Sequence, residues 1–244
     1  MYKIIADTHT HTVACDHAYS TLSENAGAAR EKGLDAIVMT EHGPAMPGAS
    51  TWMHFSNFDI IPREICGVAI IKGAEVNIMD YDGALDLDAA MLARMEWVIA
   101  SMHTPTLLPG TREQHTNAWL KITENPLVDV LGHTGDGRYE FFHEPVLKAV
   151  KETGKVIEIN SHSFRVRKGS GVNCRDIALL CEKLEIPVVV SSDAHYADTI
   201  GDFELALQML SEISFPERLI LNADKDRFFA AVEARKAYRL GAVT

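Results

Sequence analysis

Short runs of apolar residues alternate with longer segments of mixed polarity along most of the chain. Such runs, when rich in Val and Ile, are typical of buried parallel strands, and amphipathic segments between them are typical of helices that cover a sheet. The pattern therefore predicts serial βα units. Seven strands are expected at residues 3–7, 35–40, 68–75, 97–102, 128–132, 155–160 and 187–192.

The segments between the predicted strands carry helix signals. Thr21 and Glu24 have the spacing of a capping box, and Gly33 lies where a helix commonly ends. Residues 218–222 are a candidate for an eighth, short strand, whereas residues 43–57, rich in Gly, Pro and Met, have no clean period and are expected to form a long functional loop. Helices are predicted at residues 21–33, 112–124, 143–153, 174–184, 202–213 and 225–236.

The composition indicates a compact domain and narrows the classes of partner. Hydrophobic residues make up 47% and charged residues 23% of the 244 residues, as in ordinary globular proteins. The 34 acidic and 23 basic residues give a net charge of −11, which disfavours binding to nucleic acids and anionic membranes. The whole chain, residues 1–244, is expected to be a single α/β domain, because no linker or repeat divides it.

The cysteines and the N-terminus bear on the location of the protein. The four cysteines are scattered without CxxC spacing, which indicates neither a disulfide framework nor a thiolate zinc knuckle. The N-terminal apolar stretch is too short for a signal peptide, and no run of about eighteen apolar residues predicts a membrane span. A cytoplasmic location is therefore expected. The oligomeric state, including a homo-oligomer, stays open.

Every predicted strand runs into His, Asp or Glu at its C-terminal end. In a βα barrel these ends meet at one face, so that residues distant in sequence share one cavity. His9 and His11 are two residues apart in an extended segment, and Asp193 and His195 repeat this spacing. Side chains at this spacing leave the same face of a strand and are suited to holding one ion. The nine candidate metal ligands are His9, His11, His17, His42, Glu75, His103, His133, Asp193 and His195.

Seven of these nine groups are imidazoles, which favour zinc, iron or manganese over magnesium or calcium. An open catalytic zinc site uses about three protein ligands, so nine groups are enough for as many as three divalent ions. Taken alone, the HxH pair is a weak signal because surface histidines are common, and His103 or His133 alone is more simply explained as a hydrogen-bonded core residue. The whole set is not, because burying so many ionisable groups without cations would cost on the order of several kcal/mol.

Longer strings surround these residues: DTHTHTVACDHAYSTL at 7–22, TEHGP at 40–44, WMHFSNFDIIPR at 52–63, GAEVNIMDYDG at 73–83, GH at 132–133, EIN and RKGSGVNC within 158–174, and SSDAH at 191–195. Together they resemble the PHP family, named for polymerase and histidinol phosphatase, and most closely its stand-alone YcdX-like phosphatase branch. The resemblance covers nearly the whole chain. It departs at Ser161 and His162, where this branch often has Asn and Ser, so that rim of the pocket is expected to contact substrate differently.

The resemblance implies a distorted seven-stranded βα barrel, similar to a TIM barrel, with a trinuclear metal centre that usually holds zinc. The implied reaction is hydrolysis of a small phosphate monoester by a hydroxide that bridges two metal ions. The implied ligand groups are His9, His11, Glu75 and Asp193 for one ion; Glu75, which bridges, with His103 and His133 for a second; and His17, His42 and His195 for a third.

Further residues are expected to act around this centre. Glu75 and Asp193 are expected to act in catalysis by offsetting the charge of the ions and fixing their spacing. His54, on the long loop, is a candidate proton donor to the leaving group. The candidate substrate contacts are Arg167, Lys168 and Asn160, although an exposed basic pair is more often only a solvated surface.

Four other polar residues receive weaker assignments. Asp7 shares a strand face with His9 and either orients a ligand imidazole or forms hydrogen bonds inside the barrel. Cys15 lies between ligand positions and is expected to pack as a small apolar residue. His115 and His143 lie on predicted helices and receive no role.

Several other functions fit the same pattern. Within the family these are hydrolysis of histidinol phosphate and a nuclease activity, the second disfavoured by the net acidity of the chain. Amidohydrolase barrels also carry an HxH motif after the first strand, but no Lys suited to carboxylation stands among the candidate ligands. A noncatalytic metal-sensing module is the alternative from another class.

Overall fold

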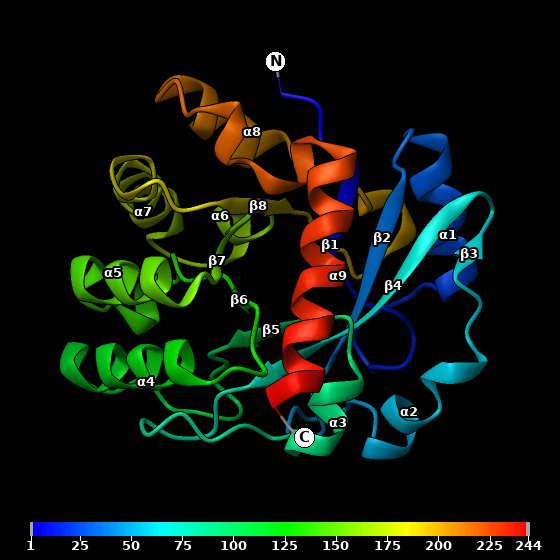
Figure 1. Cartoon of the computed structure of the whole chain (residues 1–244), viewed down its shortest axis with the longest axis horizontal. Helices are drawn as coiled ribbons and strands as arrows, with labels where there is room; N and C mark the ends of the chain where they lie inside the picture. The colour runs from blue at the N-terminus through cyan, green and yellow to red at the C-terminus, as the bar shows by residue number, and fades with distance from the viewer. Residues whose placement is uncertain (1, 243–244) are drawn as a thin grey trace.

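Seven parallel strands form a nearly closed barrel in the computed structural model, which describes residues 2–242 apart from the side chains at positions 240 and 242 (Figure 1). The strands lie in the order β1-β2-β4-β5-β6-β7-β8, and the short β3 (Glu64–Ile65) pairs antiparallel with β4 outside this path. The predicted (βα)7 barrel is therefore confirmed. The barrel strands are β1 (Ala6–Thr10), β2 (Ala36–His42), β4 (Val68–Asn77), β5 (Trp97–Ser101), β6 (Val130–Leu131), β7 (Val156–Asn160) and β8 (Val188–Ser191).

The seam between β1 and β8 is where the barrel is least regular. Thr10 forms a single parallel bridge with Ala194, and the side chain of Asn222 fills the rest of the seam. Its amide donates to the carbonyls of Ala6 and Val190 at 2.8 and 2.7 Å, and its oxygen accepts from the N–H of Val190 at 3.0 Å. Asn222 thus replaces part of the missing strand pairing.

The predicted eighth strand at residues 218–222 is wrong. This segment forms two 3₁₀ turns, η4 (Glu217–Leu219) and η5 (Leu221–Ala223), on either side of Ile220. Only Ile220 pairs with the barrel, through one parallel bridge to Val188. An apolar run as short as RLILN fits a buried turn as well as a strand, so its hydrophobicity alone could not distinguish the two.

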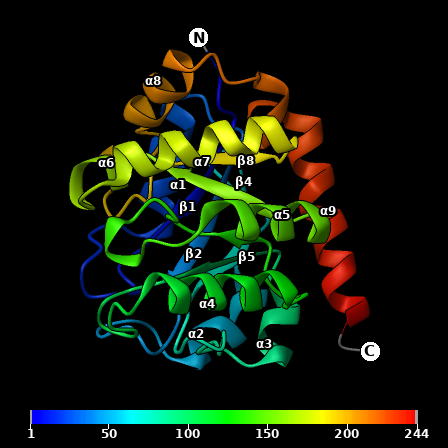
Figure 2. The same ribbon diagram turned by 90° about the vertical axis from the view of Figure 1, so that its left-hand side faces the viewer.

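Helices connect the strands and cover the outside of the barrel, and Figure 2 shows α4, α5 and α7 stacked side by side there. The predicted bounds of α4 and α5 are confirmed, and α1 begins with the predicted capping box of Thr21 and Glu24. The long loop contains the short helix α2, and the short α3 and α6 were not predicted. The helices are α1 (Leu22–Glu31), α2 (Trp52–Ser56), α3 (Ala89–Arg94), α4 (Arg112–Glu124), α5 (His143–Thr153), α6 (Ser163–Val166), α7 (Ser170–Leu184), α8 (Glu204–Glu212) and α9 (Lys225–Ala242), with 3₁₀ turns η1 (Phe58–Ile60), η2 (Gly137–Tyr139) and η3 (Ala197–Thr199).

The last helix, α9, crosses the end of the barrel that faces the viewer in Figure 1. Its Phe228 and Val232 are buried in one cluster with barrel residues such as Trp97 and Val130, and the rings of Trp97 and Phe228 lie 5.8 Å apart. This apolar cluster fills one end of the barrel. The polar groups therefore lie at the opposite end, where the C-termini of the parallel strands meet. None of the helices within residues 2–242 combines the length and apolarity needed to cross a bilayer.

Candidate metal centre

All nine predicted ligands meet at the C-terminal ends of the strands, and Glu75 of β4 lies at the centre of the group. Its Oε2 is 3.3 Å from Nε2 of His9 and 2.6 Å from Nδ1 of His42. Its Oε1 is 3.0 Å from Nε2 of His133 and 3.3 Å from Nε2 of His103. The carboxylate therefore has one oxygen toward each half of the cluster, as a bridging ligand requires.

The remaining ligands complete the two sides of this centre. Nε2 of His11 lies 3.3 Å from Oδ1 of Asp193, and Nε2 of His17 lies 3.1 Å from Nε2 of His42. The ring of His195 stacks 4.2 Å from that of His11. Three groups have ligand atoms within 4.8 Å of one another: His9, His11 and Asp193; His42, Glu75 and His103; and His11, Cys15, His42 and His195.

Hydrogen bonds determine which ring nitrogen of several imidazoles is left free to face the centre of the cluster. The Nδ1 atoms of His9, His103 and His195 lie 2.6, 2.8 and 2.9 Å from oxygens of Glu158, Asn77 and Asp193. Because each of these oxygens acts as an acceptor, Nδ1 carries a proton, and in the neutral form of the ring Nε2 keeps its lone pair. The three Nε2 atoms are thereby prepared to bind a cation.

Several buried nitrogen and oxygen atoms in the cluster lack a hydrogen-bond partner among the described residues. They include Nε2 of His9, both ring nitrogens of His11, Nδ1 of His42, Oε2 of Glu75 and Nε2 of His195. His42 and Glu75 approach to 2.6 Å, but without the geometry of a hydrogen bond. Leaving so many polar atoms unpaired would be costly, whereas divalent cations would use all of them. Imidazole nitrogen with carboxylate oxygen is a donor set suited to zinc, iron or manganese.

The electrostatics of the cluster divide its imidazoles into two kinds. Burial opposes protonation of His9, yet Glu158, Glu75 and Asp193 together hold its pKa well above the usual range. Burial, reinforced by neighbouring imidazoles, holds the pKa of His11 well below that range, and burial lowers the pKa of His103 to about 4. Most of the negative charge therefore gathers around His9.

Two of the candidate ligands occupy backbone conformations that non-glycine residues seldom adopt. His133 has φ 27° and Asp193 has φ 55°. Such conformations cost about 1–3 kcal/mol each and persist where the surroundings impose them, commonly at functional sites. A carboxylate oxygen of Glu158 accepts from the N–H of His133 at 2.6 Å and holds that turn in place.

Two residues that support the ligands were missed in the sequence. Glu158 contacts His9 and His133, as described above, and also accepts from the hydroxyl of Ser191 at 2.6 Å. Asn77 orients His103, and its own amide donates to Asp86 at 2.6 Å. An acidic residue inside the apolar string KVIEIN was the available signal, because a charged side chain in a buried strand needs partners.

The predicted substrate contacts lie in different places. Arg167 lines a cavity of about 220 Å³ beside His17, His162 and His195, and its Nη1 is 3.3 Å from Oδ2 of Asp193. Lys168 is exposed, and neither it nor Asn160 lines that cavity. The amide of Asn160 is fully buried and donates to Asp193 at 3.1 Å, so its observed contact is with a ligand.

His54 and Asp7 are both outside the cluster. His54 packs against Phe55 and Phe58, and it lines a separate cavity with Met53 and Ile60. Its role as a proton donor stays a prediction without a supporting contact.

The carboxylate of Asp7 accepts hydrogen bonds from Ser192 and from the N–H of Gly201, and these bonds orient no ligand imidazole. These hydrogen bonds connect β1 to the segment after β8. His115 and His143 lie on α4 and α5, as expected, and His115 accepts from the N–H of Gly110 at 2.8 Å.

A barrel with a histidine and carboxylate cluster at the ends of its strands defines a class of metal-binding α/β protein. Residues 7–162 match the model of the PHP domain, and this chain belongs to the PHP family. The match spans seven of the nine candidate ligands, from His9 to His133, and the other two lie beyond it.

Relatives align along nearly the full chain. A protein of Acetivibrio thermocellus named as a probable phosphatase is 41% identical over 234 residues, which cover 96% of this chain and 97% of that protein. A probable phosphatase of Thermoanaerobacter sp. is 44% identical over 236 residues, with 96% of each chain covered. The predicted family and the predicted enzyme class, a hydrolase of phosphoric esters, are confirmed.

Solved structures with the same fold include two histidinol phosphatases. The Lactococcus lactis histidinol phosphate phosphatase, crystallised with zinc, L-histidinol and phosphate, has a TM-score of 0.63 at 17% identity, and the match covers 86% of this chain and 94% of that chain. The putative histidinol phosphatase of Listeria monocytogenes has a TM-score of 0.60 at 19% identity, with 80% and 97% covered. At these identities the likeness shows the fold.

Proposed function

We propose that this protein is a metal-dependent phosphatase that hydrolyses small phosphate monoesters at a centre of three divalent ions, zinc first among them. The observation that carries the proposal is the central position of Glu75, whose two oxygens face imidazoles on opposite sides, together with the unpaired buried donors around it. A set of nine ligands is more than one or two ions require.

The ions would be held by the three ligand groups that the family resemblance implies. When bound, they would polarise the phosphoryl oxygens and make water acidic enough to act as the nucleophile. The fixed Nδ1–H tautomers of His9, His103 and His195 keep their Nε2 atoms aimed at the centre. Arg167, in the adjoining cavity, adds a guanidinium that suits a phosphate oxygen, and its present contacts include Asp193 and the hydroxyl of Ser163.

The size of the cavity supports a small substrate. About 220 Å³ accommodates a phosphate group and a compact leaving group but no folded macromolecule. Because a neighbour of the same fold binds L-histidinol and phosphate, histidinol phosphate is one candidate substrate. His162 at the cavity rim is the residue that would distinguish this chain from its relatives in substrate choice.

The decisive experiment measures turnover and metal together. Protein purified without added metal is analysed for its elements and assayed on a panel of phosphomonoesters, including histidinol phosphate and an aryl phosphate, beside single-stranded DNA. Wild type should hydrolyse monoesters, and Asp193→Ala should lose at least about a thousandfold in kcat along with part of its metal. Full activity in metal-stripped protein, or turnover of DNA alone, would refute the proposal.

A further inference from the structure

Cys15 lies at the edge of the metal centre rather than in the hydrophobic core. It sits in the turn between β1 and α1, is only 2% exposed, and belongs to neither cluster of packed apolar residues. The other two buried cysteines, Cys174 and Cys181, are both part of the main core cluster. The expectation that Cys15 packs as a small apolar residue therefore has no support from its surroundings.

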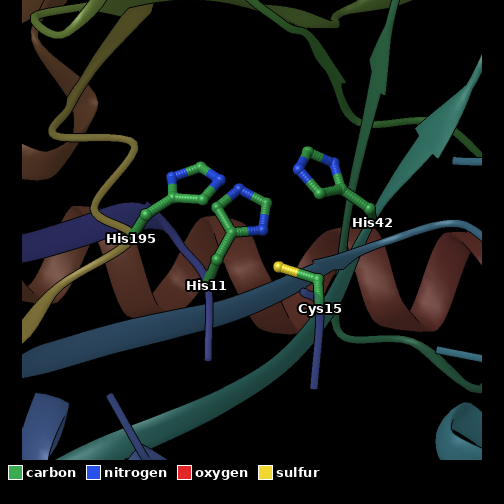
Figure 3. A group of neighbouring side chains, drawn as sticks. All are labelled: His11, Cys15, His42 and His195. Carbon is green, nitrogen blue, oxygen red and sulfur yellow. The ribbon is translucent and has the colours of Figure 1, made fainter. Parts of the chain in front are cut away.

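The sulfur of Cys15 faces imidazoles. Figure 3 shows the side chain of Cys15 pointing toward the ring of His11, with His195 on the far side of His11 and His42 above the cysteine. One donor atom from each of these four residues lies within 4.8 Å of the others, a spacing that a single cation can span. His17, the third ligand expected beside His42 and His195, lies next to both rings but, unlike the four residues of this group, is exposed to solvent.

His11 gives an independent indication of a ligand at this position. Its side chain is fully buried, and neither of its ring nitrogens has a hydrogen-bond partner among the described residues. One nitrogen, Nε2, faces Asp193 at 3.3 Å, which leaves Nδ1 for a second neighbour. With Nε2 available to an ion beside Asp193, Nδ1 of His11 carries the ring proton and needs an acceptor, which a thiolate would supply. Nδ1 of His42 and Nε2 of His195 are also buried without a hydrogen-bond partner among the described residues, and a cation beside the sulfur would use them.

We propose that Cys15 is a thiolate ligand of one divalent ion, which it holds together with His42 and His195 on the inner side of the third metal position. This inference rests on the proposed metal-dependent function and adds a sulfur donor to it. Binding breaks the S–H bond and forms a sulfur–metal bond, and the proton leaves to water. A soft thiolate favours zinc over manganese or magnesium at this one position.

The local backbone suits this role. The backbone N–H groups of His17 and Ala18 lie close enough to the sulfur to interact with it. N–H donors of this kind stabilise metal-bound thiolates.

Cobalt substitution tests the assignment through its absorption spectrum, without reference to turnover. Cobalt bound by imidazoles and carboxylates gives visible ligand-field bands, whereas a bound thiolate adds a strong charge-transfer band in the near ultraviolet. Wild type loaded with Co²⁺ should show both, and Cys15→Ser should lose the near-ultraviolet band while keeping the visible ones. Cys66→Ser, which removes an exposed thiol, is the matched control and should keep both.

The same variants allow a quantitative measurement. Cys15→Ser should bind one ion per chain roughly 10- to 100-fold more weakly, while its other ions are retained. Ligand-field bands in wild type without the near-ultraviolet band, or a band that persists in Cys15→Ser, would overturn the assignment but leave the metal centre standing. No cobalt absorption at all would overturn both. Circular dichroism checks folding, and the wild-type spectrum decides the question even if the variant misfolds.

Discussion

Nδ1 of His9 lies 2.6 Å from Oε1 of Glu158, and both side chains are fully buried. Glu158 is thus the residue that orients a central ligand, and it also holds the N–H of His133 and the hydroxyl of Ser191. A single carboxylate from β7 therefore positions groups from β1, from the turn after β6 and from β8. These three contacts make Glu158 the best place to test whether the residues that support the ligands matter as much as the ligands themselves.

Glu158→Gln should weaken metal binding while leaving the fold intact. The amide keeps the size of the side chain but loses the charge, and it cannot accept from three donors at once. We expect zinc affinity to fall roughly 10- to 100-fold, with activity recovered at high zinc. Equilibrium dialysis at controlled free zinc measures this. Glu152→Gln, an exposed position on α5, should behave as wild type; equal affinities in all three proteins would contradict the role of Glu158.

Arg167 and its neighbour Lys168 provide a second, internally controlled test. Arg167 lines the cavity at the centre, whereas Lys168 is exposed and outside it. A charge-assisted hydrogen bond to phosphate contributes about 1.5–3 kcal/mol, so Arg167→Met should raise KM for an aryl phosphate roughly 10- to 150-fold. Lys168→Met should change KM less than about twofold. Steady-state kinetics at saturating zinc measures both.

The metal content of Arg167→Met separates two explanations. Arg167 also contacts Asp193, and its charge helps to hold the pKa of that ligand well below the usual range. If the guanidinium serves substrate, zinc per chain stays unchanged while KM rises. A loss of zinc in proportion to the loss of activity would show instead that Arg167 acts through Asp193.

Acidification should release the ions in steps rather than together. His9 has a pKa well above the usual range, so it is protonated near neutrality and must lose its proton before it binds an ion. His103, with a pKa of about 4, and His11, also lowered, are already neutral there. The affinity of the His9 site for zinc should therefore fall about tenfold for each unit by which the pH drops. At His103, protons compete with zinc only near pH 4.

Zinc per chain at fixed free zinc, measured by dialysis across this pH range, tests the order of release. We expect one ion to leave in mildly acidic buffer and at least one to remain until the pH approaches the pKa of His103, about 4. Simultaneous loss of all zinc in one narrow transition would contradict the division between His9 and the low-pKa imidazoles. Zinc content that is indifferent to pH would argue against imidazole ligation itself.

The sequence predicted the parts of the structure that depend on local pattern. The predicted start of α1 follows from the capping box at Thr21 and Glu24, and the clustering of the nine candidate ligands follows from polar residues at strand ends. The start of α7 at Ser170 was missed because Gly169 caps it in a left-handed conformation, φ 83°, without a side-chain signal. Such starts depend on tertiary contacts, which no local pattern contains.

The supporting residues were harder to predict for a related reason. Glu158 and Asn77 act through partners far away in the sequence, so their roles appear only when the barrel brings β7 near β1 and places β4 beside the end of β5. Likewise, His54 lies on the long loop, in one of the sequence motifs that resemble the PHP family. Packing against Phe55 and Phe58, however, directs its side chain into another cavity. Ligand identity follows from residue type, whereas side-chain direction on a loop follows from packing.

Closure of the barrel at Asn222 yields a prediction about stability rather than chemistry. Asn222→Ala removes three buried hydrogen bonds and leaves the N–H of Val190 and the carbonyls of Ala6 and Val190 without these partners. Each buried group left unpaired costs about 1–3 kcal/mol, so the free energy of unfolding should fall by roughly 3–5 kcal/mol. Urea unfolding monitored by circular dichroism measures the change.

Asn117→Ala is the control. It removes an exposed amide that donates to the carbonyl of Tyr81, and it should lower the free energy of unfolding by less than about 1 kcal/mol. If both variants unfold at the same urea concentration, the β1–β8 seam is held by its backbone contacts, and the side chain of Asn222 is dispensable.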